Sequence, residues 1–387
     1  MKRKRVVFVV PTADAYGGEN ALLDLLLKFS SDVEPVVLAP SDGPLVRALT
    51  DAGIETRIQQ FPILERRYFH PLRIFAYLGS GLLSIFRLYA LLRDIRPDLV
   101  HTNNALILPA AVAARAARVP HVWHVREILE AHHIHPRLWT IWRWLIVSFS
   151  ARVICISTAV RKQFRDGKKV SVIHDGVDPD LFHPLRKKPS RLTRGKKGVT
   201  IGVVGRLEHR RKGQDLFIEA ASIASQPRDD LRFVIAGHER EGMEEKERVL
   251  HEMVQEYGLR EKVEFRGFVP RERMPDLMNE LDALVLCSKQ PEGLGIVLLE
   301  AMACEKAVIA FSEGGPLDII EDHENGLLIP PGDVPALARA MVELADNPKL
   351  RRDLGLKGRK TVEGFFRSEL TAKKVSELYD EILSHTS

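Results

Sequence analysis

Short apolar runs rich in valine and isoleucine recur along the whole chain, and segments with helical periodicity follow most of them, such as Glu19–Phe29 and Leu106–Ala117. Apolar runs that alternate with helices are typical of buried strands in parallel sheets. The sequence therefore predicts an α/β fold with a parallel sheet in each half. The predicted strands are Arg5–Val10, Pro35–Ala39, Ile54–Ile58, Asp98–His101, His121–Val125, Arg152–Ile156 and Val170–Ile173 in the first half, and Thr200–Val204, Leu231–Ala236, Val263–Phe265, Ala283–Leu286 and Ala307–Ala310 in the second.

The chain has 387 residues, which is too long for one ordinary hydrophobic core and suits two domains. Residues 186–198 are rich in Lys and Arg and contain little apolar sequence, so we interpret them as a basic linker that charge repulsion keeps extended. We therefore expect an N-terminal domain over residues 1–185 and a C-terminal domain over residues 199–365. A final helical segment follows at about 366–387.

The charges are distributed unevenly around a net charge of +5. Residues 1–185 contain 24 Lys or Arg and 17 Asp or Glu, the linker adds seven positive charges, and residues 199–387 contain 26 and 35. A basic half of this kind predicts an anionic surface as its partner. Because no nucleic-acid-binding motif accompanies it, we expect no nucleic acid and favour peripheral contact with a membrane of anionic lipids.

Cysteine usage and the N-terminus indicate the compartment. Cys155, Cys287 and Cys304 are scattered in apolar surroundings, so they provide no disulfide framework and fit a reducing environment. The apolar run 6–10 is too short for the core of a signal peptide and ends at Pro11. We therefore expect a cytoplasmic protein, peripheral on the inner face of the cell membrane if its basic half binds lipid.

The most informative segment begins at Glu292 and contains a second carboxylate, Glu300, eight positions later. It follows the predicted strand Ala283–Leu286 and opens a predicted helix. Glycines in such a turn let a ligand approach the backbone, and the N-terminus of the helix attracts anions. The segment thus predicts a site for a phosphate and for hydroxyl groups. The residues between the two glutamates that line this site are Gly293, Leu294, Gly295 and Ile296.

A second candidate element follows the strand Thr200–Val204. Gly205 ends this strand, and the cationic residues Arg206 and Lys212 come shortly after it. Open α/β sheets bind ligands at the carboxyl ends of their strands, so this pair predicts a clamp for a diphosphate. Neither half carries the glycine-rich turn of dinucleotide-binding proteins or a P-loop, which disfavours NAD- and ATP-dependent chemistry.

These two elements together resemble the retaining GT-B glycosyltransferases of family 4, whose E-x7-E motif and Gly-Arg-Leu…Lys-Gly element they match, and the resemblance runs across both halves. It implies two Rossmann-like domains that face a central cleft, with the C-terminal helix crossing back to the N-terminal domain. It also implies transfer of a sugar from a nucleotide-diphosphate-sugar to an acceptor hydroxyl with retention of configuration. No metal or other cofactor is expected.

In the C-terminal domain the resemblance gives each motif residue a role. Arg206 and Lys212 hold the donor diphosphate, Glu292 binds the hydroxyls of the sugar, and Glu300 binds the ribose. Residues 312–316 resemble a further glycine-containing loop that lies near the base or the sugar.

In the N-terminal domain the resemblance points to two strand ends. Gly17 and Gly18, in the first strand–helix loop, would line the cleft opposite the donor, and Arg126 and Glu127 would join them. His124, at the end of His121–Val125, would lie close to the reacting centre of the sugar. Glu292 and His124 are thus the predicted catalytic residues.

Two features nearby need separate interpretation. Asp175 stands where the family usually has Asn in an Asn-Gly-Val-Asp turn, and an Asx-Gly turn tolerates either residue. His132, His133 and His135 crowd one loop, but they lack the ordered, carboxylate-supported geometry of a metal site, so we predict none.

Two segments mix apolar residues with arginine. Leu72–Leu92 approaches transmembrane length but contains Arg73 and Arg87, and residues 138–144 combine tryptophan and arginine at the spacing of interfacial helices. They fit equally well as core helices packed on the sheet. If they contact a membrane, the acceptor is a lipid-linked substrate.

Two other functions stay open: a nucleotide-sugar epimerase on the same fold, and a non-catalytic GT-B subunit that binds a glycan or nucleotide-sugar. The basic pair combined with the two glutamates favours transfer over both. A role in cell-envelope glycan or glycolipid biosynthesis is expected by family-level analogy.

Overall fold

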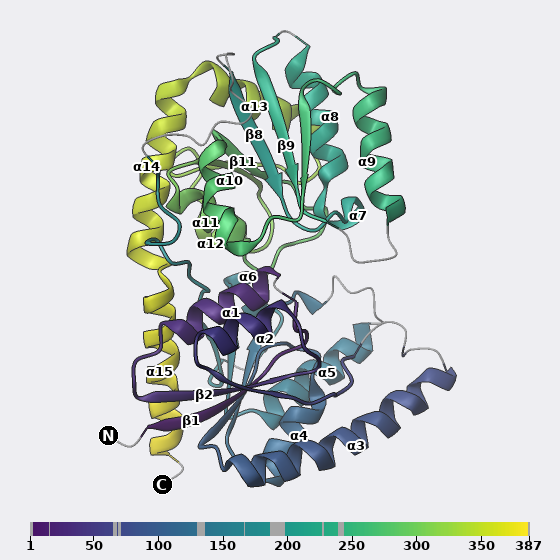
Figure 1. Ribbon diagram of the computed structural model, residues 1–387, viewed down its shortest axis with the longest axis vertical. Coiled ribbons are helices and arrows are strands. Elements are labelled where there is room, and N and C mark those ends of the chain that lie inside the picture. The colour runs from purple at the N-terminus through teal and green to yellow at the C-terminus, as the bar shows by residue number, and fades with distance from the viewer. Residues whose placement is uncertain are drawn as a thin grey trace. The chain divides into compact units, whose positions relative to one another are not determined.

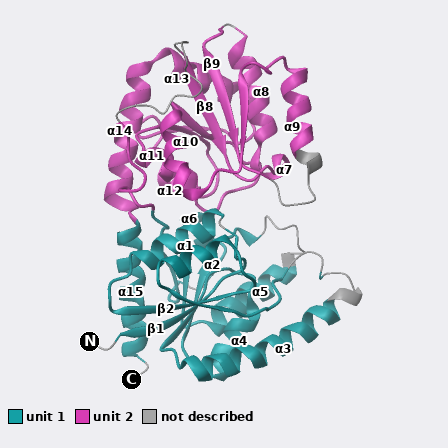
Figure 2. Ribbon diagram, viewed as in Figure 1, with its two compact units in different colours: residues 1–176, 368–387 teal, residues 177–367 magenta. Residues whose placement is uncertain are grey.

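The computed structural model describes residues 3–14, 16–64, 68, 71–129, 136–165, 167–185, 198–226, 228–238 and 244–385. They form two compact units, shown in teal and magenta in Figure 2. Unit 1 comprises residues 1–176 and 368–387, and unit 2 comprises residues 177–367.

Unit 1 contains a seven-stranded parallel sheet in the order β3-β2-β1-β4-β5-β6-β7 (Figure 1). The strand order reverses between β1 and β4, so the carboxyl ends of these strands form the switch point where open α/β sheets bind ligands. All seven strands were predicted to within a few residues. They are β1 (Lys4–Val9), β2 (Val33–Ala39), β3 (Glu55–Ile58), β4 (Leu99–Thr102), β5 (His121–Val125), β6 (Arg152–Cys155) and β7 (Val170–Val172).

Alternate side chains of β1 enter two different cores. Val6 and Phe8 pack with α1 and α15, whereas Val7 and Val9 pack with α3 and α4 on the other face of the sheet. Because both faces are covered, the strands are apolar on both sides, as the sequence indicated. The helices of unit 1 are α1 (Gly17–Leu27), α2 (Pro44–Asp51), α3 (Pro71–Ile95), α4 (Leu108–Ala116), α5 (Pro136–Phe149), α6 (Thr158–Arg161) and α15 (Ser368–Ser384).

The C-terminal helix α15 belongs to unit 1, which confirms the predicted return of the chain to the N-terminal domain. Tyr379 of this helix is fully buried, and Asp380 lies 2.8 Å from the ammonium of Lys4 at the start of β1. A salt bridge between Lys4 and Asp32, also 2.8 Å long, continues this contact to the loop before β2.

Unit 2 contains a six-stranded parallel sheet in the order β10-β9-β8-β11-β12-β13. Its strands are β8 (Val199–Val204), β9 (Leu231–Ala236), β10 (Val263–Gly267), β11 (Ala283–Leu286), β12 (Ala307–Phe311) and β13 (Leu327–Ile329), and the last of them was not predicted. Its helices are α7 (His209–Lys212), α8 (Gln214–Ser225), α9 (Glu244–Glu256), α10 (Met274–Glu280), α11 (Ile296–Ala303), α12 (Pro316–Ile319), α13 (Val334–Asp346) and α14 (Pro348–Phe365), with a 3₁₀ turn at Arg271–Arg273. The predicted α/β fold with two Rossmann-like halves is confirmed.

The chain passes from unit 1 to unit 2 after Gly176, nine residues before the end of the predicted N-terminal domain. Contacts at both ends of residues 177–185 explain this difference. The backbone N–H of Val177 donates a 2.9 Å hydrogen bond to the carbonyl of Phe366, and the buried amide of Asn279 on α10 accepts a hydrogen bond from the N–H of Leu185 and donates one to the carbonyl of His183, both 2.9 Å long. These bonds tie the segment before the linker to unit 2. The predicted linker 186–198 lies outside the described residues except for Gly198.

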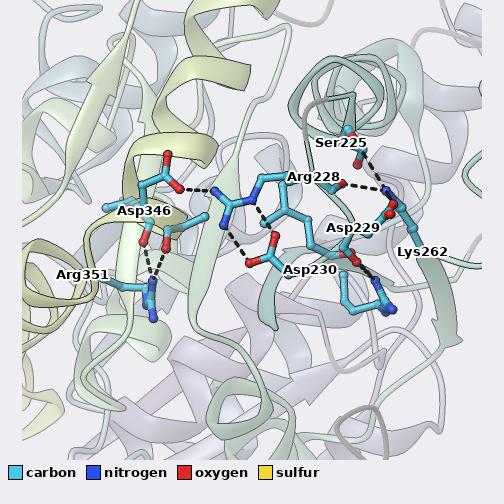
Figure 3. A network of polar contacts seen from close by, with 11 residues as sticks. Ser225, Arg228, Asp229, Asp230, Lys262, Asp346 and Arg351 are labelled. Atoms are coloured by element: carbon cyan, nitrogen blue, oxygen red, sulfur yellow. Dashed lines mark hydrogen bonds and ion pairs between the residues drawn. The ribbon is translucent and has the colours of Figure 1, made fainter. Parts of the chain in front are cut away.

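Ion pairs link the strand starts of unit 2 to the end of α13 (Figure 3). The guanidinium of Arg228 binds both carboxylate oxygens of Asp230, at 2.6 and 2.7 Å, and also pairs with Asp346. Lys262 extends the network through the carbonyl of Arg228, at 2.9 Å, and the carboxylate of Asp229, at 3.0 Å. Bidentate contacts of this geometry are among the stronger surface ion pairs.

We predict that Arg228→Ala lowers the free energy of unfolding of unit 2 by about 1 kcal/mol, because partial exposure limits what each ion pair contributes. The Arg228 hydrogen bonds lower the pKa of Asp230, against the effect of its partial burial. The contribution of Asp230 is therefore present above its unfolded pKa and is lost as the pH falls through the lowered value. Urea unfolding of the variant and of wild type should differ at neutral pH and converge in acid. Arg352→Ala, at an exposed position of α14, is the control, and an equal loss in that variant would contradict the prediction.

Candidate functional site

The carboxyl edge of the sheet in unit 2 brings together two residues that the sequence assigned to different parts of the donor. Lys212 ends α7, and Glu292 lies 80 positions later in the loop between β11 and α11. Their side chains form an ion pair, with 2.7 Å between Lys212 Nζ and Glu292 Oε1. The hydroxyl of Ser288, which follows β11, donates a second hydrogen bond to the same carboxylate oxygen.

This ion pair fixes the charge of Glu292. Burial by itself would raise the pKa of the carboxyl group, but the Lys212 ammonium, the Ser288 hydroxyl and the charge of Arg211 together lower the pKa below its ordinary value. Glu292 is therefore ionised at neutral pH. In that state it accepts hydrogen bonds and has no proton to give as a general acid.

Close backbone contacts hold the loops around this pair. Gly213, directly after Lys212, has φ +72°, and a Cβ there would lie 1.9 Å from the carbonyl oxygen of Cys287. Gly315 donates its backbone N–H to the carbonyl of Glu292 over 2.8 Å, and a Cβ on it would lie 2.2 Å from Cα of Leu294. Glycine is required at both positions because side chains would separate the packed segments. The 312–316 loop thus lies against the Glu292 loop.

Gly205 and Arg206, two further donor-site candidates, follow strand β8. Gly205, with φ +155°, follows β8, which pairs with β11, and the carbonyl of Arg206 accepts a 2.8 Å hydrogen bond from the buried Gln214. The guanidinium of Arg206 lies 3.5 Å from Glu208.

The E-x7-E segment forms the start of α11. Gly295, with φ +95°, precedes the helix, Ile296 is its first residue and half-buried Glu300 its fifth. At about 1.5 Å per residue, Glu300 lies roughly 6 Å along the axis from the helix start. Leu294 is buried, so what it offers a ligand is its backbone, next to the half-buried Gly293.

In unit 1 a buried chain of polar groups ends at His124. The hydroxyl of Tyr379 lies 2.6 Å from His101 Nδ1, and His101 Nε2 lies 3.1 Å from His124 Nδ1. The other nitrogen of His124, Nε2, is 4.0 Å from a carboxylate oxygen of Asp175. These four residues come from α15, β4, β5 and the turn after β7, so the tertiary fold alone brings them together.

Burial lowers the pKa of both His101 and His124 well below the ordinary value, and the positive charge of Arg126 makes a smaller contribution in the same direction for each ring. Each ring is therefore neutral and carries one N–H. If Tyr379 donates to His101, then His101 donates to His124, and the proton of His124 is on Nε2. The Asp175 carboxylate, 4.0 Å from Nε2 of His124, favours the same tautomer, because it attracts an N–H on Nε2 and would repel a lone pair there.

Arg126 joins this cluster from the end of β5. Its guanidinium pairs with Asp175 and donates a 3.0 Å hydrogen bond from Nε to Asn103. A Cβ on Gly18, in the first turn of α1, would lie 3.6 Å from Cδ of Arg126. The structure therefore brings Gly18, Arg126 and His124 to one edge of the sheet, whereas Gly17 and Gly18 are the first residues of α1 rather than members of the loop before it.

Three buried donors of this cluster lack a hydrogen-bond partner among the described residues: His124 Nε2, Asn103 Nδ2 and one terminal nitrogen of Arg126. Buried donors are rarely left unsatisfied, because the lost hydration costs about 1–3 kcal/mol for each group. Donors that converge at a ligand-binding edge of the sheet indicate a ligand with several acceptor oxygens.

Glu127 makes contacts that the sequence did not indicate. The sequence placed its side chain in the cleft with Arg126, but the carboxylate accepts hydrogen bonds from the backbone N–H groups of Ala105 and Arg126, at 3.2 and 3.1 Å, and from the amide of Asn104. These contacts satisfy the carboxylate within its own unit. Glu127 therefore holds the loop after β4 in place.

Sequence reasoning missed several members of both clusters. Asp175 was interpreted only as a turn residue, and Ser288, His101 and Tyr379 were not singled out. His101 ends a predicted strand and Ser288 follows another, so position at a strand end could have found them. Tyr379, in the C-terminal helix, gave no such signal. The loop histidines His132, His133 and His135, for which we predicted no metal site, lie outside the described residues.

Comparison with known proteins agrees with this geometry. Residues 186–361 match the family described as glycosyl transferases group 1, and residues 16–181 match glycosyltransferase family 4. The chain belongs to these glycosyltransferases, and it is an enzyme of that class.

Individual relatives cover most of the chain. EpsD of Bacillus subtilis (strain 168), named as a putative glycosyltransferase, is 28% identical in an alignment 342 residues long that covers 83% of this chain and 86% of EpsD. The D-inositol 3-phosphate glycosyltransferase of Streptomyces scabiei (strain 87.22) is 25% identical in a gapped alignment of length 395 that covers 96% of this chain and 85% of the relative. The crystal structure of Anabaena HepE with UDP-glucose superposes with a TM-score of 0.84 at 23% identity, covering 97% of this chain and 99% of HepE. The shared fold is therefore GT-B.

We predict that Lys212→Met raises the pKa of Glu292 above its ordinary value, because the carboxylate stays buried without its ammonium partner. In wild type the ionised Glu292 stabilises the fold above its unfolded pKa, and this contribution is lost as the pH falls through the lowered value. In the variant the buried, ionised Glu292 destabilises the fold at neutral pH by about 1–3 kcal/mol, and protonation of this carboxylate in acid removes the destabilisation. The unfolding midpoints of wild type and variant should thus converge only as the pH falls through the lowered pKa of wild-type Glu292, below the ordinary value of about 4.3.

The double variant Lys212→Met/Glu292→Gln is the control for that titration. It lacks the carboxylate, so its stability should not recover in acid. A single variant that shows the same pH profile as the double variant would contradict the predicted ion pair.

We predict that neutral His124 carries its proton on Nε2. In long-range proton–nitrogen correlation spectra of protein labelled with nitrogen-15 histidine, the signals lost in His124→Gln identify the ring. Nε2 should have the shift of a protonated nitrogen and Nδ1 that of an unprotonated one. Tyr379→Phe removes the donor that orders the chain, so part of the population should change tautomer. A protonated Nδ1 in wild type would contradict this assignment.

Proposed function

We propose that the protein is a retaining glycosyltransferase that transfers a sugar from a nucleoside-diphosphate sugar to an acceptor hydroxyl. The observation that carries the proposal is the ion pair between Lys212 and Glu292 at the carboxyl edge of the sheet in unit 2. The Lys212 ammonium would bind the donor phosphates, and the ionised Glu292 carboxylate, one hydrogen bond away, would accept hydrogen bonds from the sugar hydroxyls.

The donor would bind along two neighbouring strand ends of unit 2. Arg206 after β8 and Lys212 at the end of α7 provide positive charge for the diphosphate, and the first backbone N–H groups of α11, the helix that follows β11, add to it. Glu300, one turn into α11, would accept hydrogen bonds from the ribose hydroxyls. Uridine diphosphate is the first candidate nucleotide, because HepE, which shares this fold, has been solved with UDP and with UDP-glucose.

The transfer would proceed on one face of the sugar. The acceptor oxygen forms a bond to the anomeric carbon as the bond from that carbon to the diphosphate oxygen breaks, and the acceptor proton passes to the departing diphosphate. Glu292 does not take this proton, since the Lys212 ammonium keeps its pKa low. Its carboxylate would orient the hydroxyls and stabilise the positive charge that develops on the ring. We propose that Arg206 and Lys212 supply the charge stabilisation of the leaving group without a metal ion.

The polar cluster of unit 1 would serve the sugar and the acceptor. Its three unsatisfied donors, on His124, Asn103 and Arg126, match a substrate rich in hydroxyl or phosphate oxygens. An N–H on His124 Nε2 would donate to such an oxygen and would leave the histidine without a role as a base. We propose an acceptor of the glycan or lipid-linked class, in cell-envelope glycan or glycolipid biosynthesis.

Two variants test the donor site. Lys212→Ala should weaken binding of UDP tenfold or more, because it removes a phosphate contact and leaves the Glu292 charge to repel the anion (about 1.4 kcal/mol per factor of ten). Glu292→Gln should leave UDP affinity within about threefold but reduce turnover roughly a hundredfold, because the carboxylate acts on the sugar. Calorimetric titration with UDP, GDP and ADP in EDTA measures the first effect, and release of nucleoside diphosphate from each donor sugar measures the second.

Lys357→Ala is the matched control, because it breaks a lysine–glutamate pair elsewhere in unit 2, between Lys357 and Glu324. Its UDP affinity should equal that of wild type. Failure of all three nucleotides to bind, or unchanged affinity in Lys212→Ala, would refute the donor site. The anomeric configuration of the product, determined by NMR, decides whether transfer is retaining.

A further inference from the structure

Helix α3 is apolar on two sides, although a helix at the surface of a globular unit normally has a polar outer face. Its inner side carries Leu88, Leu92 and Ile95, which are at most 3% exposed and pack in one core with β1, β2 and α4. This packing accounts for one apolar side of the helix. It leaves the other unexplained.

The opposite side of α3 exposes large apolar side chains at helical spacing. They form a continuous stripe rather than the scattered single residues that are normal on protein surfaces. The exposed fractions are 72% for Phe75, 58% for Leu78, 58% for Leu82, 50% for Leu83, 63% for Phe86 and 37% for Tyr89.

Helix α5 repeats this arrangement. Its inner side chains Trp139, Trp142 and Ile146 are buried, whereas Leu138, Ile141 and Trp144 are 41%, 55% and 64% exposed. Helix α4 contacts both α3 and α5, and right-handed crossovers place all three helices on one face of the sheet in unit 1 (Figure 1). These two helices hold nine of the eighteen exposed large apolar side chains in the described residues.

The charged residues of these two helices are almost all basic. The sequences of α3 and α5 contain five arginines and a single acidic residue, Asp94, near the end of α3. Arg87, Arg93 and Arg137 are exposed beside the apolar side chains. Apolar and aromatic side chains flanked by arginine complement the interface of an anionic bilayer, whereas a partner protein need not be anionic.

By length and composition alone, residues 74–95 could also cross a membrane: they have a mean hydropathy of 1.5, and 17% of the 18-residue stretch that meets this test is buried. They are the one such helix in the described part of the chain. A crossing would remove Leu88, Leu92 and Ile95 from the core of unit 1. The packing of α3 therefore favours a helix that lies in the membrane plane with one side on the protein and the other in lipid.

We propose that the exposed apolar side chains of α3 and α5 insert into the surface of a bilayer that contains anionic lipid. The side chains would enter the boundary between headgroups and acyl chains, and the arginines would contact lipid phosphates. This surface would hold unit 1 beside substrates that are themselves anchored in the membrane. The inference does not depend on the transfer chemistry proposed for the site, since vesicle binding is measured without any sugar donor.

The protein carries its own reporter for this contact. Among its four tryptophans, Trp144 is exposed, whereas Trp123, Trp139 and Trp142 are at most 8% exposed. Vesicles of phosphatidylcholine and phosphatidylglycerol in equal parts should shift its fluorescence to the blue, and brominated acyl chains should quench it. Trp144→Phe should abolish the spectral change, while the variant should still sediment with vesicles.

The triple variant Phe75→Ser/Leu82→Ser/Phe86→Ser should lower the vesicle partition coefficient about tenfold or more. Phe365→Ser in unit 2 is the matched control, because Phe365 is as exposed as Phe75, at 72%, and it should bind vesicles like wild type. Pure phosphatidylcholine vesicles and high salt should both weaken binding, since each removes attraction to the arginines. Calorimetric titration of the triple variant with UDP shows, independently of vesicle binding, whether the variant is folded and keeps its donor site.

Equal binding by the triple variant and wild type, or no binding by wild type, would overturn the proposal. A third outcome would also overturn the proposal: wild type is a dimer in the absence of vesicles, and the triple variant is a monomer. The occupant of this surface would then be a second copy of the chain. Sedimentation equilibrium of both proteins decides this point.

Discussion

Both units depend on one constraint: a parallel sheet can be buried only if helices cover both of its faces. The faces are then filled with apolar side chains such as Val6 and Val7, which enter opposite cores. Polar chemistry is left to the strand ends, where loops meet and helices begin. Ser288 after β11 and His124 at the end of β5 both lie at a carboxyl edge for this reason.

Charge at these edges is stabilised by pairing. Lys212 and Glu292 form one ion pair in unit 2, and Arg126 and Asp175 form another in unit 1. Each pair allows a charged group to remain in a partly dry environment that favours strong electrostatic contacts with a ligand. The two edges differ in what they leave open, because the cluster of unit 1 retains unsatisfied donors while the Glu292 carboxylate of unit 2 is already held by two donors. The polar cluster of unit 1 therefore suits a ligand rich in acceptor oxygens.

Helix α3 is the exception to the rule that apolar surface is covered. Its inner residues, such as Leu92, pack as the sheet requires, while Phe75 and Phe86 stay exposed. Exposed apolar area of this extent favours association with lipid or protein. The proposed contact of α3 and α5 with a membrane would bring the enzyme to substrates that stay in the bilayer. It is therefore consistent with the lipid-linked acceptor proposed for the site.

The sequence by itself determined the α/β class, all seven strands of unit 1 and the donor motifs, because strand burial and glycine turns leave local patterns. It placed Lys212 and Glu292 in one donor site, but not in one ion pair, and it gave no reason to connect Tyr379 with His124. It also missed the contacts that draw residues 177–185 into unit 2, and that Glu127 turns toward its own loop. These contacts join positions far apart in the chain, and only the tertiary structure decides them, since a local pattern specifies which residues are polar and not which of them meet.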